Sequence, residues 1–137
     1  MPIVYVAMSN VMQEWGADVG VSKRLYKIGL VDGDPQEAVQ DVCAENYAGH
    51  SDWQLVGSRE VDGLDAETVL QRASERQKML DPLYYPHIKG VKDIVRLDQR
   101  KVEANIVIKK TMEGRDSKVP KLKPADFAEF LIESVLQ

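Results

Sequence analysis

The segment Leu25-Tyr26-Lys27-Ile28-Gly29-Leu30-Val31 decides the fold that we expect for this chain. It is a short apolar run, and the turn Asp32-Gly33-Asp34-Pro35 follows it. A second apolar run, Pro2-Ile3-Val4-Tyr5-Val6-Ala7-Met8, lies upstream. Both runs have the composition of β-strands that are bounded by turn-forming residues. We expect strands at 3–8 and 24–31 to pair, which brings Tyr5 and Lys27 together beside a helix that begins at the Asp34-Pro35 turn.

The rest of the chain alternates short apolar runs with helices whose starts are marked by capping residues. Asp34, Pro35 and Glu37 form a helix start with a capping box. The expected elements are strands 53–61 (with a bulge at Gly57) and 93–97, helices 35–46, 66–80, 99–113 and a last one from Pro124, and a long loop at 10–23 with one helical turn at 11–15. This order predicts an α+β fold with a small central mixed β-sheet flanked by helices and an amphipathic C-terminal helix. We divide the chain into a domain at 1–113 and a basic connection with the C-terminal helix at 114–137.

The overall composition is that of an ordinary globular protein. The 137 residues are 44% hydrophobic and 29% charged, which suits one domain with a substantial core. The formal net charge of -4 argues against a wholly basic nucleic-acid binder but permits a local basic groove. A single cysteine, Cys43, excludes an internal disulfide and a cysteine-rich zinc cluster. No apolar run approaches the roughly 20 residues that span a bilayer, and no signal peptide is evident, so we expect a cytoplasmic protein without a membrane partner.

The two apolar runs, the turn and the helix start together resemble the GIY-YIG nuclease-like superfamily. The most similar branch is that of the small phage and bacterial domains in which the second motif reads KIG. The resemblance covers roughly residues 3–112 and is strongest over residues 3–42. Ile3-Val4-Tyr5 stands in the place of the family's GIY motif, so Tyr5 matches the first tyrosine. Lys27-Ile28-Gly29 stands in the place of YIG, so Lys27 replaces the second tyrosine.

The resemblance implies a divalent-metal-dependent endonuclease that hydrolyses phosphodiester bonds in DNA. It implies catalytic roles for Tyr5, Lys27 and Glu67, with Glu67 as the ligand of Mg²⁺ or Mn²⁺. A metal ion held by a carboxylate acts as a Lewis acid. A tyrosine or lysine can position or deprotonate water if its environment lowers its pKa.

One position departs from the family pattern. The family places an arginine on the helix after its second motif, and this chain has Ala38 there, with no arginine between residues 31 and 58. An arginine can bind phosphate oxygens through two parallel hydrogen bonds, so its loss removes a transition-state contact. The resemblance therefore implies weakened or absent catalysis, unless Arg24, Arg59 or Arg72 substitutes in space.

Each candidate residue also has an ordinary structural interpretation. Tyr5 on an internal strand is usually a core residue. Lys27 is more often a surface lysine, and Glu67 is more often a solvated carboxylate on a helix. The joint order of the three residues favours the functional interpretation, whereas Ala38 weighs against it.

Three functions stay open. The first is a weakened metal-dependent nuclease, and the second is a non-catalytic relative that binds DNA or protein. For DNA binding, the basic residues Lys109, Lys110, Lys118 and Lys121 are candidates to follow a phosphate backbone, although interspersed acidic residues also suit a solvated surface. The third is an accessory module that dimerises or binds a protein partner through its C-terminal helix.

Overall fold

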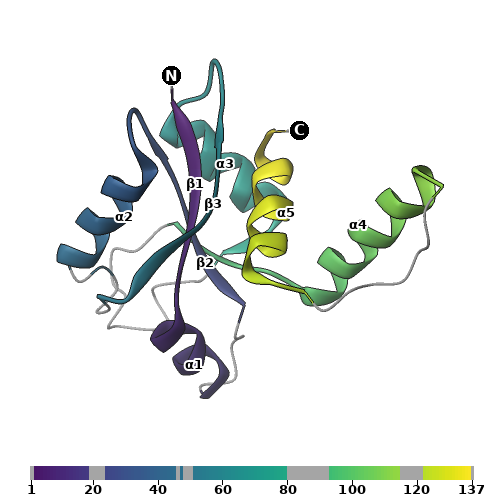
Figure 1. Ribbon diagram of the computed structural model, residues 1–137, viewed down its shortest axis with the longest axis horizontal. Coiled ribbons are helices and arrows are strands. Elements are labelled where there is room, and N and C mark those ends of the chain that lie inside the picture. The colour runs from purple at the N-terminus through teal and green to yellow at the C-terminus, as the bar shows by residue number, and fades with distance from the viewer. Residues whose placement is uncertain are drawn as a thin grey trace.

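An antiparallel sheet with helices on both faces organises the described part of the protein (Figure 1). The computed structural model describes residues 2–18, 24–45, 47, 51–79, 93–114 and 122–136. In chain order these residues form β1 (Ile3–Ser9), α1 (Asn10–Asp18), β2 (Leu25–Val31), α2 (Pro35–Ala44), β3 (Trp53–Glu60), α3 (Ala66–Arg76), β4 (Lys78–Met79), β5 (Ile94–Arg96), α4 (Gln99–Met112) and α5 (Pro124–Leu136). The predicted α+β class, with a small sheet flanked by helices and a helix at the C-terminus, is confirmed.

The strands lie in the order β3-β1-β2-β5-β4, so β2 with its KIG triplet is the central strand. The expected pairing of the first two strands is confirmed, with Tyr5 opposite Gly29 and Ala7 opposite Lys27. On its other side β2 pairs with β5, where Lys27 lies opposite Ile94. Every described pairing is antiparallel, where we expected a mixed sheet.

Successive side chains of a strand point to opposite faces of the sheet, and each face has its own core. The core on the α5 face contains Val4, Val6, Tyr26 and Ile28 of the strands, with Val69 of α3 and Leu131 of α5. The core on the α2 face contains Tyr5, Ala7 and Leu25 of the strands, with Met12 of α1 and Val39 of α2. Tyr5 and Lys27 therefore belong to the α2 face, because they alternate with residues of the α5 face.

The C-terminal helix is an integral part of the core on the α5 face. Its buried residues are Phe127, Ala128, Leu131, Ile132 and Val135. The helix lies closely over β3, where a Cβ on Gly57 would come within 2.7 Å of the Cβ of Ala128. Residues 114–137, which we separated from residues 1–113, thus contribute their helix to the same core.

The bulge that we expected at Gly57 is present in β3 and lies one residue earlier, at Val56. Val6 of β1 lies opposite Gly57, but the next residue, Ala7, lies opposite Leu55. Val56 is therefore the extra residue of β3, which is the arrangement of a β-bulge.

The long loop that we expected at residues 10–23 was wrong for its first half, where α1 forms. A distant carboxylate caps this helix: Asp52 accepts hydrogen bonds from the backbone nitrogen of Val11 at 3.1 Å and from the Ser9 hydroxyl. The Ser9 hydroxyl oxygen in turn accepts a hydrogen bond from the backbone nitrogen of Met12 at 3.1 Å. Because Asp52 lies 41 residues from Val11 along the chain, no local pattern could reveal the cap.

The helix α4 projects from the body that the sheet and the other helices form, as Figure 1 shows. Its residue Val102 is buried, whereas Ile108 and Met112 near its other end are 58% and 83% exposed. Part of its apolar surface is therefore in contact with solvent.

Candidate functional site

Tyr5 and Lys27, the candidate residues of β1 and β2, meet on the α2 face of the sheet. The ammonium nitrogen of Lys27 donates a hydrogen bond to the Tyr5 hydroxyl oxygen at 3.2 Å. Tyr5 is 6% exposed and Lys27 is 5% exposed, so this contact is buried. The strand pairing thus brings the two motif positions that we singled out into direct contact.

Gly29, the last residue of the KIG triplet, makes room for the ring of Tyr5. It lies directly opposite Tyr5 in the sheet, and a Cβ placed on it would lie 2.7 Å from both Cζ and Oη of that ring. Carbon atoms in ordinary contact are about 3.5–4.0 Å apart, so any larger residue would displace the tyrosine. The glycine is needed here for space, and the Tyr5 ring lies across β2 as a result.

Asp93 joins this pair from the residue that precedes β5. One carboxylate oxygen, Oδ2, forms an ion pair with the ammonium nitrogen of Lys27 at 2.8 Å. The other, Oδ1, accepts a hydrogen bond from the hydroxyl of Tyr47. The backbone carbonyl of Asp93 accepts a hydrogen bond from the backbone nitrogen of Ile28 at 3.0 Å, so the sheet itself fixes Asp93 beside Lys27.

Two aromatic rings flank the Lys27 ammonium. Its nitrogen lies 5.2 Å from the centroid of the Tyr5 ring and 5.0 Å from that of the Tyr47 ring, which is within the range of cation–π attraction. Trp53 of β3 holds Tyr47 in place, because its indole nitrogen donates to the Tyr47 carbonyl at 3.0 Å and its ring meets the Tyr47 ring edge-on. We call Tyr5, Lys27, Tyr47 and Asp93 together the buried polar cluster.

The buried polar cluster keeps Lys27 protonated. Burial alone would lower the pKa of Lys27, but the negative charge of Asp93, together with Tyr5, outweighs it and raises that pKa above its ordinary value. The pKa of Tyr47 is also raised, first by burial and then by its hydrogen bond to the Asp93 carboxylate. Lys27 is therefore a charged donor near neutral pH and unsuited to be a general base, and Tyr47 stays a hydroxyl donor.

The sequence did not predict Asp93 and Tyr47 as site residues. Asp93 was expected only as the first residue of a short strand. Its contact with Lys27 joins residues that are 66 positions apart, so it becomes visible only once β2 and β5 are known to pair. For Tyr47, just beyond α2, we find no signal in the sequence that could have identified it.

Glu67, the third predicted catalytic residue, lies apart from the buried polar cluster. It is an exposed residue in the first turn of α3. The buried residues of that helix, Val69 and Ala73, pack into the core on the α5 face, whereas Tyr5 packs into the core on the α2 face. The structure therefore brings Tyr5 and Lys27 together but does not bring Glu67 to them.

The magnesium or manganese ion that the resemblance implies at Glu67 has no cluster of protein ligands among the described residues. Magnesium takes six oxygen ligands, and several of them are usually waters. Within the described ranges, no three His, Cys, Asp or Glu side chains are grouped so that they could hold a metal. Both carboxylate oxygens of Asp93 already accept hydrogen bonds. The metal that the resemblance implies stays a prediction.

Ala38 lies on the side of α2 that we expected. It is half-buried and packs against the same core as Tyr5 and Val39. The three arginines that we considered as substitutes all contact α5: Arg24 lies 4.7 Å from the centroid of the Phe127 ring, Arg59 lies 4.0 Å from Glu129, and Arg72 donates to the Val135 carbonyl at 2.9 Å. Because these three arginines interact with α5, none of them supplies the guanidinium that is missing at Ala38.

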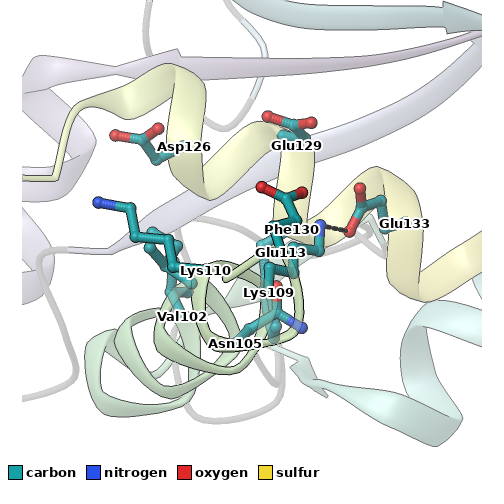
Figure 2. Close-up of a pocket in the computed structure, with 10 residues that line it drawn as sticks. Val102, Asn105, Lys109, Lys110, Glu113, Asp126, Glu129, Phe130 and Glu133 are labelled. Carbon is teal, nitrogen blue, oxygen red and sulfur yellow. Dashed lines mark hydrogen bonds and ion pairs between the residues drawn. The ribbon is translucent and has the colours of Figure 1, made fainter. Parts of the chain in front are cut away.

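The predicted DNA-binding lysines of α4 face carboxylates of α5, as Figure 2 shows. Lys109 forms an ion pair with Glu133. Lys109 and Lys110 line a groove of about 470 Å³ between α4 and α5, which Asp126 and Glu129 also line. Lys118 and Lys121 lie outside the described residues. The described part of the basic segment is therefore interspersed with acidic groups on a neighbouring helix.

Comparison with known proteins adds no relative: no family model, no curated protein and no solved structure matches the chain. None of the helices in the described ranges is long and apolar enough to cross a membrane. The resemblance to the GIY-YIG superfamily therefore stays a prediction from the motifs quoted above.

Proposed function

We propose that the chain is a GIY-YIG-like domain that binds DNA at the buried polar cluster and cleaves it weakly or not at all. The observation that supports this most is the 3.2 Å contact between Lys27 and Tyr5, because these residues occupy the two motif positions. Gly29 adds support, since its missing side chain admits the Tyr5 ring. The proposal includes the cytoplasmic location that the sequence led us to expect.

An ammonium and a phenolic hydroxyl side by side suit a phosphate oxygen. Lys27 supplies a positive charge, and the Tyr5 hydroxyl, whose oxygen accepts from Lys27, keeps its own proton to donate. Hydrogen bonds between charged partners are about twice as strong as neutral ones, and a buried setting strengthens them further. A DNA phosphate is therefore the class of ligand that this pair favours.

Three features argue against efficient hydrolysis. Lys27 is protonated and so cannot take a proton from water. Ala38 supplies no guanidinium, and the loss of one such contact costs about 3–4 kcal/mol of transition-state stabilisation by analogy with an oxyanion donor. Glu67 lies on α3, whose packing face belongs to the other core.

Binding of a short fluorescent single-stranded DNA, followed by anisotropy at several salt concentrations, tests the proposal. We expect weak binding that Lys27→Met abolishes and Tyr5→Phe weakens. For single-stranded DNA, one or two phosphate contacts predict a slope of about -0.7 to -1.4 in a plot of log affinity against log salt, whereas contacts from four lysines predict about -3.

The control is charge reversal at Lys109, Lys110, Lys118 and Lys121. If this reversal abolishes binding and Lys27→Met does not, DNA binds at the basic segment and not at the buried polar cluster. If the natural chain binds no DNA at low salt, DNA binding is wrong.

The catalytic half of the proposal is tested by Ala38→Arg, assayed for DNA cleavage with Mg²⁺ or Mn²⁺. Cleavage gained in this variant and lost again on adding Glu67→Ala supports a weakened nuclease. No cleavage by any folded variant supports a domain that only binds. Robust cleavage by the natural chain that is indifferent to Glu67→Ala means that the active site lies elsewhere.

A protein-interaction module is the second candidate, and α4 supports it. This helix projects from the body (Figure 1), with Ile108 and Met112 largely exposed. The apolar residues of α5 such as Phe127 and Leu131 are already buried, so α4 is a better contact surface than the C-terminal helix that we first considered. Sedimentation equilibrium of the natural chain and of Ile108→Glu separates the cases: an oligomer that dissociates in the variant supports the module.

A further inference from the structure

We infer that Tyr5, Lys27 and Tyr47 form a phosphate-binding pocket and that the carboxylate of Asp93 occupies it. An external phosphate group therefore binds there only when the Asp93 side chain moves out of the pocket. The inference deepens the proposed function and rests on it for the natural source of the phosphate, which is DNA. The pocket itself is defined by the contacts among the four residues.

The donors converge on the Asp93 carboxylate as they would on a bound anion. Lys27 donates to Oδ2 at 2.8 Å, and the Tyr47 hydroxyl donates to Oδ1. The Tyr5 hydroxyl lies against the same ammonium, at 3.2 Å. A phosphate group likewise presents several oxygens to separate donors, so it can replace a carboxylate in such a pocket.

Contacts other than those to Asp93 hold each donor in place. The Tyr5 ring lies against Gly29 of β2. Lys27 extends from the central strand of the sheet between two aromatic rings. Tyr47 is held by Trp53 through a hydrogen bond and an edge-on ring contact. The pocket is therefore expected to persist when the carboxylate is removed.

The positive charge of Lys27 favours an anion in the pocket. The side chain of Lys27 is only 7% exposed, and an ammonium at such a depth is strongly destabilising without a partner. In the natural chain the carboxylate of Asp93 is this anion. Because it belongs to the same polypeptide, its effective concentration is high, and a free phosphate must compete with it. A variant without the carboxylate should therefore take up phosphate from solution.

The test is the thermal unfolding midpoint of Asp93→Ala in a titration with inorganic phosphate, with chloride at equal ionic strength as the reference. Phosphate should raise this midpoint progressively, because a ligand that binds only the folded state stabilises it. The dissociation constant should be lower than that of the natural chain by about tenfold or more, the effect of one strong ionic contact. The added substitution Lys27→Met should abolish the response.

Asp52→Ala is a matched control. Asp52 also accepts two hydrogen bonds, from Ser9 and from the backbone of Val11, but at the start of α1. Phosphate should act on this variant no more than chloride does. An equal response in both variants would mean a general salt effect, and the pocket would be wrong.

A variant that fails to fold is still informative. If Asp93→Ala is unfolded in chloride, phosphate should restore its circular dichroism and the fluorescence of Trp53. The closer replacement Asp93→Asn keeps the shape and one acceptor oxygen, so a weaker gain of phosphate affinity is expected there. If phosphate neither stabilises nor refolds either variant beyond chloride, the inference is overturned.

Short DNA in place of phosphate separates this inference from the proposed function. If phosphate stabilises Asp93→Ala but DNA binds no variant, the phosphate pocket is supported and the proposed DNA binding is contradicted. A different result would contradict only the blocking role of Asp93. In that case DNA binding depends on Lys27 and is equal in the natural chain and in Asp93→Ala, and phosphate stabilises neither chain. The proposed DNA binding would then still be supported.

Discussion

Replacing Gly29 by alanine should separate Tyr5 from Lys27 without changing either residue. The added Cβ would lie 2.7 Å from Cζ and 2.8 Å from Cε1 of the Tyr5 ring. Relief to an ordinary contact requires the ring to move by about 1 Å. The 3.2 Å hydrogen bond from Lys27 to the Tyr5 hydroxyl would then be stretched beyond bonding distance.

The expected cost has two parts. Overpacking of a core by one methyl group costs about 1–3 kcal/mol. Loss of a buried hydrogen bond from a charged donor adds about 1.5–3 kcal/mol. We therefore expect Gly29→Ala to lower the free energy of unfolding by about 2.5–6 kcal/mol, towards the lower end if the sheet relaxes.

Urea denaturation measures the stability change, and the side-chain ammonium signal of Lys27 in ¹⁵N NMR reports the hydrogen bond. Gly57→Ala is the matched control: its Cβ would also meet a neighbour at 2.7 Å, namely Ala128 of α5, on the other face of the sheet. Both variants should be destabilised, but only Gly29→Ala should broaden or shift the Lys27 signal. A Gly29→Ala variant as stable as the natural chain, with an unchanged Lys27 signal, would refute this reasoning.

Three further predictions follow from the same contacts. Lys27→Met should lower the free energy of unfolding by about 3–5 kcal/mol, because it leaves the carboxylate of Asp93 unpaired in a largely buried place; urea denaturation should show part of the loss recovered on adding Asp93→Asn. Stability should fall as the pH rises above about 10, because unfolded Lys27 and Tyr47 lose their protons near 10.5 and 10.0 while both pKa values are raised in the folded chain. Tyr47→Phe should make that fall shallower, and an unchanged pH profile of stability in this variant would contradict the role of the Tyr47 hydroxyl. Asp52→Ala should cost about 1–2 kcal/mol by removing the cap of α1, with faster hydrogen exchange in that helix but not in α2; equal protection of both helices in the variant would count against the cap.

The elements that the sequence predicted well are those whose signals are local. The two apolar runs with their turn predicted β1, β2 and the meeting of Tyr5 with Lys27. The capping residues at Asp34 predicted the start of α2, where the Asp34 carboxylate accepts from the Gln36 backbone nitrogen at 2.9 Å. These patterns act over a few residues, so they can be recognised without knowledge of the fold.

The features that the sequence missed depend on contacts between distant segments. The cap of α1 comes from Asp52, and the partner of Lys27 is Asp93, which directly precedes β5 and lies 66 positions further along the chain. Glu67 was expected near Tyr5 because it occurs in the order of the family pattern. An order of elements does not state which face of a sheet a helix covers, and α3 packs on the face opposite to Tyr5.

Binding of DNA phosphate at Tyr5 and Lys27 is tested most directly by NMR, with a titration of the ¹⁵N-labelled chain with a short single-stranded DNA. In the natural chain we predict the largest chemical-shift changes at the Lys27 ammonium and at the backbone amides of Tyr5 and Asp93. In Asp93→Asn we predict larger chemical-shift changes, at lower DNA concentration. Changes confined to α4, with the Lys27 ammonium signal unmoved at saturation, or no changes at all in either chain, would contradict it.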